Sequence, residues 1–268
     1  MDLENSPEST DTFINKLPLI TASFWLMKIT ATTLGETGGD WLSMTMNVGY
    51  LASTLVFFAI FVLALGVQLL SKKHHAYLYW TVIIATSTAG TTMSDYMDRT
   101  LELGYAKGAA ILVSILLGLL FAWKLSVGNV SVNDIRTRKA EVFYWITILF
   151  SNTLGTALGD FLADDSGLGF LGSWLLITGV LAVILALTFM TKINRVLLFW
   201  LAFILTRPFG ATFGDLLTKE HEKGGLDFGR GYSSLILLGI LIACILVSYR
   251  KNQNKTQNHL RPSPAISG

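Results

Sequence analysis

Apolar and polar positions alternate in long blocks along this chain. Eight mainly apolar stretches are separated by short polar segments, and each has about the 20 residues that a helix needs to cross a bilayer. The predicted spans are residues 18–37, 47–70, 76–95, 106–125, 141–160, 168–190, 194–215 and 231–249. A segment in lipid must satisfy its own backbone hydrogen bonds, so we expect helices here rather than strands.

The odd-numbered spans share a signature that occurs four times. An aromatic residue precedes a Trp, a Gly follows ten residues later, and a small residue and an Asp complete the pattern. The copies are Trp25/Gly35/Gly39/Asp40, Trp80/Gly90/Ser94/Asp95, Trp145/Gly155/Gly159/Asp160 and Trp200/Gly210/Gly214/Asp215. A fixed internal period indicates a repeat architecture. The sequence therefore predicts an all-α polytopic membrane protein of eight transmembrane helices, built from four parallel two-helix repeats.

The spacing of the copies indicates how the repeats are grouped. The steps between signature Asp residues are 55, 65 and 55 residues, which is typical of a duplicated pair. We expect a cytoplasmic N-terminal segment (1–17), a first membrane half (18–125), a cytoplasmic linker (126–140), a second membrane half (141–249) and a disordered cytoplasmic tail (250–268). The signature helices should form an inner bundle around a pseudo-fourfold or paired two-fold axis.

Composition and charge narrow the class of protein. Hydrophobic residues make up 52% of the chain and charged residues 14%, values typical of a protein whose partner is the lipid bilayer. The net charge of +2 gives no indication of nucleic-acid binding, and the single cysteine leaves no intrachain disulfide. Thirteen Lys and Arg residues flank one side of the predicted spans and five the other. This bias predicts that both termini are cytoplasmic. A homo-oligomer is compatible with the pattern.

The aromatic and small residues of the signature have structural interpretations. Trp25, Trp80, Trp145 and Trp200 fall near the cytoplasmic interface, where aromatic belts anchor membrane helices. Small residues four positions apart let membrane helices approach closely. The eight that we expect to pack in this way are Gly35, Gly39, Gly90, Ser94, Gly155, Gly159, Gly210 and Gly214. Such packing would bring the four Asp residues near one another.

A polar stripe runs from each Asp toward the middle of the membrane when the helix is followed four residues at a time. Its members are Thr32, Ser87, Thr91, Asn152 and Thr156. Hydroxyl groups can bond to their own helix or join neighbouring helices. Because the stripe recurs and ends in a carboxylate, we favour a polar pathway.

Three charged residues interrupt the symmetry of the repeats: Lys28, Glu36 and Arg207. A charge at the centre of a membrane helix costs about 2.5–3.5 kcal/mol, so such residues usually face the interior and are paired. Arg207 is a candidate partner for Glu36 or Asp215. Lys28 can pair with Glu36, directly or through Thr32, or extend toward the cytoplasm.

The repeated carboxylates suggest the function. Two unit charges 4 Å apart repel by about 4 kcal/mol at an effective dielectric of 20. The four Asp residues must therefore stay apart in water, be partly protonated or share a cation. Oxygen ligands suit hard cations such as Mg²⁺, Ca²⁺ or Mn²⁺. We expect a transporter or channel-like protein for a small cation, such as a divalent metal.

In this interpretation Asp40, Asp95, Asp160 and Asp215 form the site, with Lys28, Glu36 and Arg207 as coupling or gating charges. The metal is the substrate, and no cofactor is expected. One alternative is a proton-coupled carrier of a small organic solute or anion, in which Lys28 and Arg207 bind the substrate. Another is a membrane scaffold or sensor that transports nothing.

An enzyme is not expected. The Gly-Asp step is similar to that of intramembrane aspartyl proteases, whose motif has Gly three residues before the Asp. The corresponding positions here are Thr37, Thr92, Ala157 and Thr212. The sequence also contains no nucleophile-elbow, phosphate-loop or zinc signature.

On the strength of the four signature copies, the chain from about Phe24 to Tyr249 resembles a bacterial membrane-protein family made of four tandem "repeat of unknown function" units. Each unit of that family has two transmembrane segments and a Trp. The resemblance implies the eight-helix fold and a location in the bacterial inner membrane, and it assigns no catalytic residues. The fourth copy departs from the pattern, because Arg207-Pro208 stands where the other copies have two uncharged polar residues.

Overall fold

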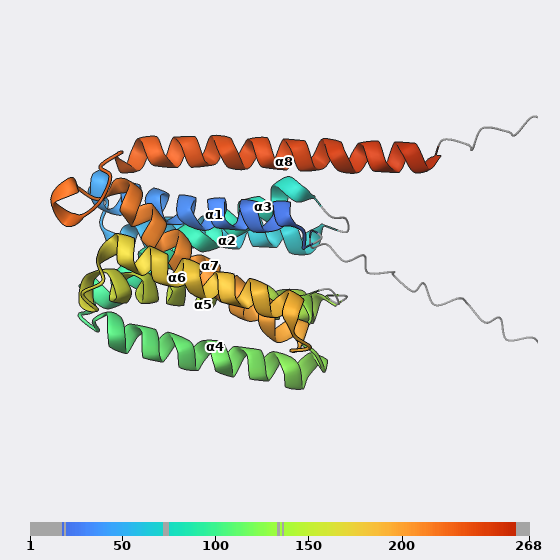
Figure 1. Cartoon of the computed structure of the whole chain (residues 1–268), viewed down its shortest axis with the longest axis horizontal. Helices are drawn as coiled ribbons and strands as arrows, with labels where there is room; N and C mark the ends of the chain where they lie inside the picture. Colours follow the sequence, from blue (N-terminus) through green and yellow to red (C-terminus); the bar gives the residue numbers. More distant parts are fainter. Residues whose placement is uncertain (1–17, 19, 72–74, 133–134, 136, 261–268) are drawn as a thin grey trace, which may run out of the picture.

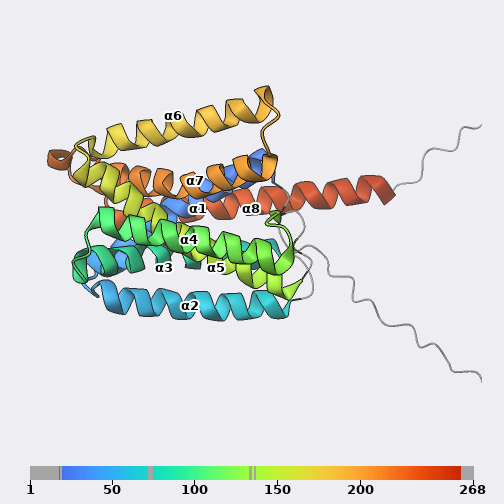
Figure 2. The same cartoon turned by 90° about the horizontal axis from the view of Figure 1, so that it is seen from below.

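The computed structural model describes residues 18, 20–71, 75–132, 135 and 137–260. Within them, long helices run nearly side by side in one bundle (Figures 1 and 2). The helices are α1 (Ala22–Asp40), α2 (Tyr50–Leu70), α3 (Ala76–Asp95), α4 (Tyr105–Val127), α5 (Arg138–Asp160), α6 (Gly169–Met190), α7 (Arg195–Thr218) and α8 (Arg230–Leu260). The all-α prediction is confirmed. We call the two ends of the bundle the aspartate end and the tryptophan end, after the signature residues found there.

The four signature helices form a closed inner ring, in which α1 and α5 each contact both α3 and α7. Each plain helix packs against the signature helix of the following repeat. Thus α2 packs on α3, α4 on α5, α6 on α7, and α8 returns to pack on α1. The expected halves therefore contribute to one ring, with the signature helices inside as the sequence predicted.

Six of the helices are long and apolar enough to cross a membrane, namely α2, α4, α5, α6, α7 and the part of α8 up to Ser248. Helices α1 and α3 are not among the six, and both contain many Thr, Ser and Gly residues, most of which are buried in the ring. The contrast in burial is clear, since 72% of the most apolar window of α5 is buried but only 11% of that of α2.

The connections at the aspartate end repeat as well. In the first three repeats the Asp ends the α-helix, and a five-residue π-helical turn follows: η1 (Trp41–Thr45), η2 (Tyr96–Thr100) and η4 (Phe161–Asp165). In the fourth repeat α7 instead continues to Thr218, before the short 3₁₀ helix η5 (His221–Lys223). All four connections end on a glycine with φ between 67° and 83°, a conformation that glycine adopts without a steric penalty. These glycines are Gly49, Gly104, Gly169 and Gly229.

The structure differs from the sequence prediction in the C-terminal tail and in the linker between the halves. Helix α8 continues to Leu260 and projects beyond the bundle (Figure 1), so residues 250–260 of the expected disordered tail are helical. Residues 251–260 contain neither Gly nor Pro to end the helix, and Lys and Gln are good helix formers. Residues 1–17 and 261–268 lie outside the described residues. The linker packs against the bundle, because Val132 and Ile135 are buried and the Val130 carbonyl accepts a hydrogen bond from Trp200 Nε1 at 2.9 Å.

Candidate functional site

The signature glycines hold the ring together in cyclic order. A Cβ on any of them would collide with the residue seven positions after the Trp of the next repeat. Gly35 meets Ser87 and Gly155 meets Arg207, while a Cβ on Gly90 would lie 2.9 Å from Asn152 Cβ. Gly210 closes the ring against Thr32, whose carbonyl carbon would lie 2.9 Å away. The ring axis is therefore lined by the positions that were expected to carry the polar stripe.

One turn nearer the aspartate end, the second set of small residues repeats this contact. A Cβ on Gly39 would lie 3.1 Å from Thr91 Cβ, and one on Gly159 would lie 3.0 Å from Ala211 Cβ. Gly214 similarly packs against Glu36, at 3.1 Å from its Cβ. Ser94, at the equivalent place in the second repeat, is buried and donates a hydrogen bond to Asp98 Oδ2 at 3.2 Å. The helices thus approach closely enough to place one residue from each repeat around the axis.

Glu36 and Arg207 pair at the centre of the ring. Arg207 Nη2 lies 3.1 Å from Glu36 Oε2, and both side chains are buried. Thr156 accepts a hydrogen bond from Arg207 Nη2 at 2.8 Å and donates to Glu36 Oε2 at 3.3 Å. Thr91 contacts both charges in the same way, donating to Glu36 Oε2 at 3.3 Å. Of the two partners expected for Arg207, the structure selects Glu36.

The guanidinium group of Arg207 also reaches the main chain of two other helices. It donates to the carbonyl of Thr32 in α1 at 3.1 Å and to that of Ser87 in α3 at 3.3 Å. Its partners therefore lie on α1, α3 and α5, while Arg207 itself belongs to α7. A planar group with five N–H donors can satisfy this arrangement, whereas a Lys ammonium cannot.

The predicted pathway residues are all buried in the ring: Thr32, Ser87, Thr91, Asn152 and Thr156. Several of them form hydrogen bonds to one another or to neighbouring helices. Asn152 Nδ2 donates to Thr86 Oγ1 across the α3–α5 contact at 3.0 Å. Thr32 Oγ1 donates to the Thr206 carbonyl at 3.2 Å.

The signature carboxylates lie inside the protein at the aspartate end. Asp40, Asp95, Asp160 and Asp215 are only 2%, 1%, 2% and 3% exposed. Glu36, Asp160 and Asp215 come from three different helices, and each offers a carboxylate oxygen within 4.8 Å of the other two. We call these three residues the axial acidic triad. The arrangement can hold a cation with oxygen ligands.

Basic side chains from the aspartate end bridge the carboxylates in pairs. Arg99 joins Asp95 to Asp160, with Nε–Oδ1 at 2.9 Å and Nη2–Oδ2 at 3.3 Å. The guanidinium carbon of Arg99 also lies 5.6 Å from the centre of the Tyr105 ring. Burial alone would lower the pKa of Arg99, but the two carboxylates outweigh burial and raise it. Arg99 is therefore held charged against the acidic group.

Lys219 makes the corresponding bridge between the first and fourth repeats. Its Nζ lies 3.1 Å from Asp215 Oδ1 and 3.8 Å from Asp40 Oδ2. Burial lowers the pKa of Lys219, but the nearby carboxylates of Asp215 and Asp40 raise it by more, so the net shift of the pKa is upward. Arg230 Nε also lies 3.4 Å from Asp40 Oδ2.

The sequence analysis did not predict these contacts, and it counted Arg99, Lys219 and Arg230 only among the five basic residues on one side of the predicted spans. Arg99 and Lys219 each stand four residues after a signature Asp, a spacing that brings side chains together on a helix. That spacing was a usable signal. Arg230 had no comparable one, since it reaches Asp40 from the start of α8.

The formal charges around the triad do not cancel. Five buried carboxylates (Glu36, Asp40, Asp95, Asp160 and Asp215) pair with four basic groups (Arg99, Arg207, Lys219 and Arg230), which leaves one negative charge in excess. Asp95 Oδ2 accepts no hydrogen bond from the described residues. These ion pairs therefore contain one more carboxylate than basic groups, and the buried Lys28 and Asp98 lie outside them.

Toward the tryptophan end, apolar side chains fill the axis. Ile83, Ile148 and Phe203, which we call the apolar layer, are completely buried together with Lys28. The Lys28 Nζ lies 4.3 Å from the centre of the Phe203 ring and has no hydrogen-bond partner among the described residues. Lys28 therefore neither pairs with Glu36 nor extends to the surface, contrary to both expectations. The surrounding helices cover the Lys28 side chain completely, so its ammonium group does not reach the surface.

Three of the four expected interface anchors are covered by protein. Trp80, Trp145 and Trp200 are 1%, 0% and 4% exposed, so they pack within the bundle and not against lipid. The physical reason is that neighbouring aromatic rings cover them: Trp80 and Trp145 each contact the aromatic residue of the preceding repeat, and Trp200 contacts Trp123. The ring centres of Trp145 and Tyr79 are 5.5 Å apart, and those of Trp25 and the aromatic residue before Trp200 are 5.8 Å apart. Trp25 remains partly exposed.

A comparison with protein-family models divides the chain into the same four repeats. The family model described as Repeat of Unknown Function (DUF347) matches four times, over residues 23–74, 78–129, 143–194 and 198–254. Each match begins with a signature helix of the ring and extends through the plain helix that follows it. No curated protein and no solved structure matches the chain. The four matches cover most of the sequence, and the chain therefore belongs to the Repeat of Unknown Function family, as a protein of four tandem units.

Proposed function

We propose that this protein spans the bacterial cytoplasmic membrane with all eight helices and transports a small cation through the axial acidic triad. The observation that carries this proposal is the approach of Glu36, Asp160 and Asp215, whose carboxylate oxygens lie within 4.8 Å of one another in a buried position. Two unit charges at that distance repel by about 3.5 kcal/mol at an effective dielectric of 20. A cation among the three oxygens would turn this repulsion into attraction.

The size of the triad suits an ion with oxygen ligands. Three oxygens that lie no more than 4.8 Å apart all fall within about 2.8 Å of one common point. Calcium–oxygen distances are about 2.3–2.6 Å and magnesium–oxygen distances about 2.0–2.1 Å. A small inward movement of the carboxylates would satisfy an ion of the size of Ca²⁺, and Mg²⁺ would require a larger one. The ion is the substrate in this proposal and not a resident cofactor.

The charges favour a cation over an anion. The ion pairs at this end contain one more carboxylate than basic groups, and the hydrogen bonds of Arg207 to Thr32, Ser87 and Thr156 leave its guanidinium little capacity for an anionic substrate. Lys219 and Arg99 act as tethered cations that cover the carboxylates. An incoming cation would compete with Lys219 for Asp215, at a contact that is now 3.1 Å long.

The proposed direction of entry follows from the loop charges. The excess of Lys and Arg at the tryptophan end favours a cytoplasmic position for that end and for both termini. The acidic triad would then be loaded from the outside. Since the apolar layer and Lys28 fill the axis below it, passage requires the signature helices to separate there. Glu36 belongs to the triad, and its partner Arg207 stands one helical turn from Phe203 of the apolar layer, so the pair is suited to couple the two regions.

Two variants of α5 and its π turn test the proposal. Asp160→Asn removes one triad charge, whereas Asp164→Asn removes the same charge from an exposed residue one turn further on. Purified protein in proteoliposomes would be supplied in turn with Na⁺, K⁺, Mg²⁺, Ca²⁺ and Mn²⁺, and the entrapped ion measured by mass spectrometry. Total metal content of expressing cells gives the same comparison in vivo.

We expect wild type and Asp164→Asn to accumulate one cation and Asp160→Asn to lose that accumulation while eluting as a folded protein. Uptake that is equal in Asp160→Asn and wild type would refute the role of the triad. Failure of the wild type to move any of these ions, with the protein correctly inserted, would refute cation transport itself.

A further inference from the structure

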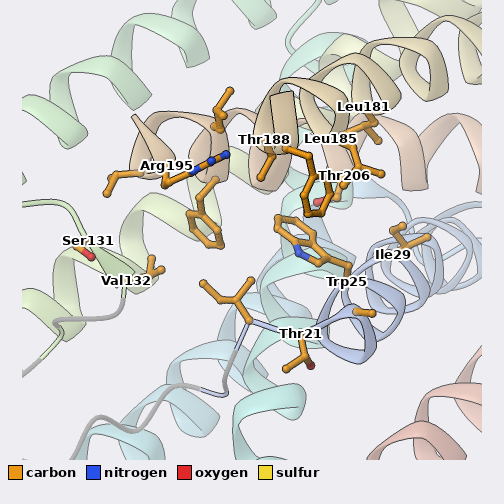
Figure 3. Close-up of a pocket in the computed structure, with 16 residues that line it drawn as sticks. Thr21, Trp25, Ile29, Ser131, Val132, Leu181, Leu185, Thr188, Arg195 and Thr206 are labelled. Atoms are coloured by element: carbon orange, nitrogen blue, oxygen red, sulfur yellow. The ribbon is translucent and has the colours of Figure 1, made fainter. Parts of the chain in front are cut away.

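An apolar groove opens on the outside of the ring at the tryptophan end, away from the acidic triad. It has a volume of about 730 Å³ and lies between the start of α1, the last turns of α6 and the start of α7. Figure 3 shows Trp25 in the middle of the groove, with Leu181, Leu185 and Thr188 of α6 on one side and Val132 of the linker on the other. Leu185 is 60% exposed, so the groove faces whatever surrounds the helices.

In the preceding repeat, the position equivalent to this groove is filled by a side chain. Trp123 of α4, in the second repeat, packs against the third and fourth repeats, with its ring 6.4 Å from Tyr144 and 5.7 Å from Trp200. The signature Asp residues of the second and third repeats are 65 residues apart, so the position in the third repeat that is equivalent to Trp123 is Thr188. A threonine is too small to occupy that space. Trp25 is consequently left partly exposed, unlike the other signature tryptophans.

The depth of the groove corresponds to one leaflet of a bilayer. Along α7 its lining extends from Arg195 to Thr206, eleven residues apart, or about 16 Å of helix. Half of a hydrocarbon core is about 15 Å. In a membrane this space would be exposed to acyl chains, which are the apolar molecules present there in quantity.

Charge at the mouth of the groove specifies the head group. Arg195 is exposed and is the charged residue among those that line the groove, and the described lining contains no Asp or Glu. Lys192 is exposed in the loop just before it. Hydroxyl groups of Thr21, Ser131 and Thr188 add hydrogen-bonding capacity. Basic residues at a membrane surface attract anionic lipids.

We infer that this groove binds a phospholipid with an anionic head group. One acyl chain lies against Trp25 and Leu185 in the place that Trp123 fills in the preceding repeat, and the phosphate contacts Arg195. This inference does not depend on cation transport, since neither Trp25 nor Arg195 belongs to the acidic group.

Native mass spectrometry of the purified full chain tests the inference. The protein would be titrated with phosphatidylglycerol and, separately, with phosphatidylcholine of the same acyl chains. We expect wild type to prefer phosphatidylglycerol and Arg195→Ala to bind it about five-fold more weakly, the factor typical of one basic residue near an anionic lipid. Lys124→Ala is the matched control, because Lys124 of α4 is exposed at the same tryptophan end of the bundle as Arg195 but does not line the groove.

A second variant separates the groove from the charge. Thr188→Trp should fill the groove as Trp123 does, abolish binding of both lipids at this site and leave the protein folded. Phosphatidylglycerol that carries bromine atoms on its acyl chains should quench Trp25, and quenching should fall in Trp25→Phe. Equal binding of the two lipids by wild type, or unchanged binding in both Arg195→Ala and Thr188→Trp, would overturn the inference.

Discussion

Neutralising one partner of the Glu36–Arg207 pair should destabilise the protein strongly, because the other charge would remain buried. The informative changes are Glu36→Gln and Arg207→Met. Methionine keeps a straight side chain, so the alkyl contact of Arg207 with Gly155 is largely retained. The two single variants and the double variant form a thermodynamic cycle.

The structure indicates the size of the effect. Removing one partner of a buried ion pair costs about 3–5 kcal/mol. Glu36→Gln should lie near the lower limit, since a Gln oxygen can still accept from Thr91 and Thr156. Arg207→Met should lie near the upper limit, because the bonds to the Thr32 and Ser87 carbonyls disappear as well. A loss of 3 kcal/mol changes the unfolding constant by about a factor of 10².

Equilibrium unfolding in mixed micelles titrated with SDS, followed by tryptophan fluorescence, measures these free energies. The double variant should be no less stable than Arg207→Met alone, because the buried charge left by each single change is then absent. Glu220→Gln is the control, since the Glu220–Lys223 pair is 3.5 Å long and more than 60% exposed, and such pairs contribute about 0–1 kcal/mol. Strictly additive losses in the cycle would refute the reasoning.

Three further outcomes follow from the same packing. Gly90→Ala should lower stability by about 1–3 kcal/mol because its Cβ would lie 2.9 Å from Asn152 Cβ, whereas Gly118→Ala, with open space around it, should not; SDS unfolding distinguishes the two. Lys28→Met should raise the melting temperature, since its buried Nζ has no hydrogen-bond partner among the described residues; a clear loss of stability would show that Lys28 has a bound counter-charge. Burial raises the pKa of Asp98 from its ordinary 3.8 to about 6, so its contribution to stability is present below pH 4 and lost as the pH rises through 6. The difference in melting temperature between Asp98→Asn and wild type should therefore grow over that range, and a constant difference would contradict it.

The repeat unit and its inward face could be predicted from residues alone. A signature with a fixed step defines equivalent positions, and following a helix four residues at a time identifies one face. The faces read from Asp40, Asp95, Asp160 and Asp215 are the ones that line the ring axis. Both patterns are local, because helical geometry relates residues within a few turns of one chain segment. A glycine with positive φ stands nine residues after the Asp in the first three repeats and fourteen after it in the fourth, outside the signature.

The partners of each side chain depended on the assembled ring. Arg207 and Glu36 are far apart in the chain, and only the contact of α7 with α1 brings them together. Trp145 is the type of residue that anchors helices at a membrane interface, yet Tyr79 of the preceding repeat packs on it and it is buried. The groove at Thr188 exists because one equivalent of Trp123 is small. The amphipathic period along the chain thus determined the helices and their inner faces, whereas packing between distant helices decided which charges meet, because contact between helices depends on shape and register that no single segment contains.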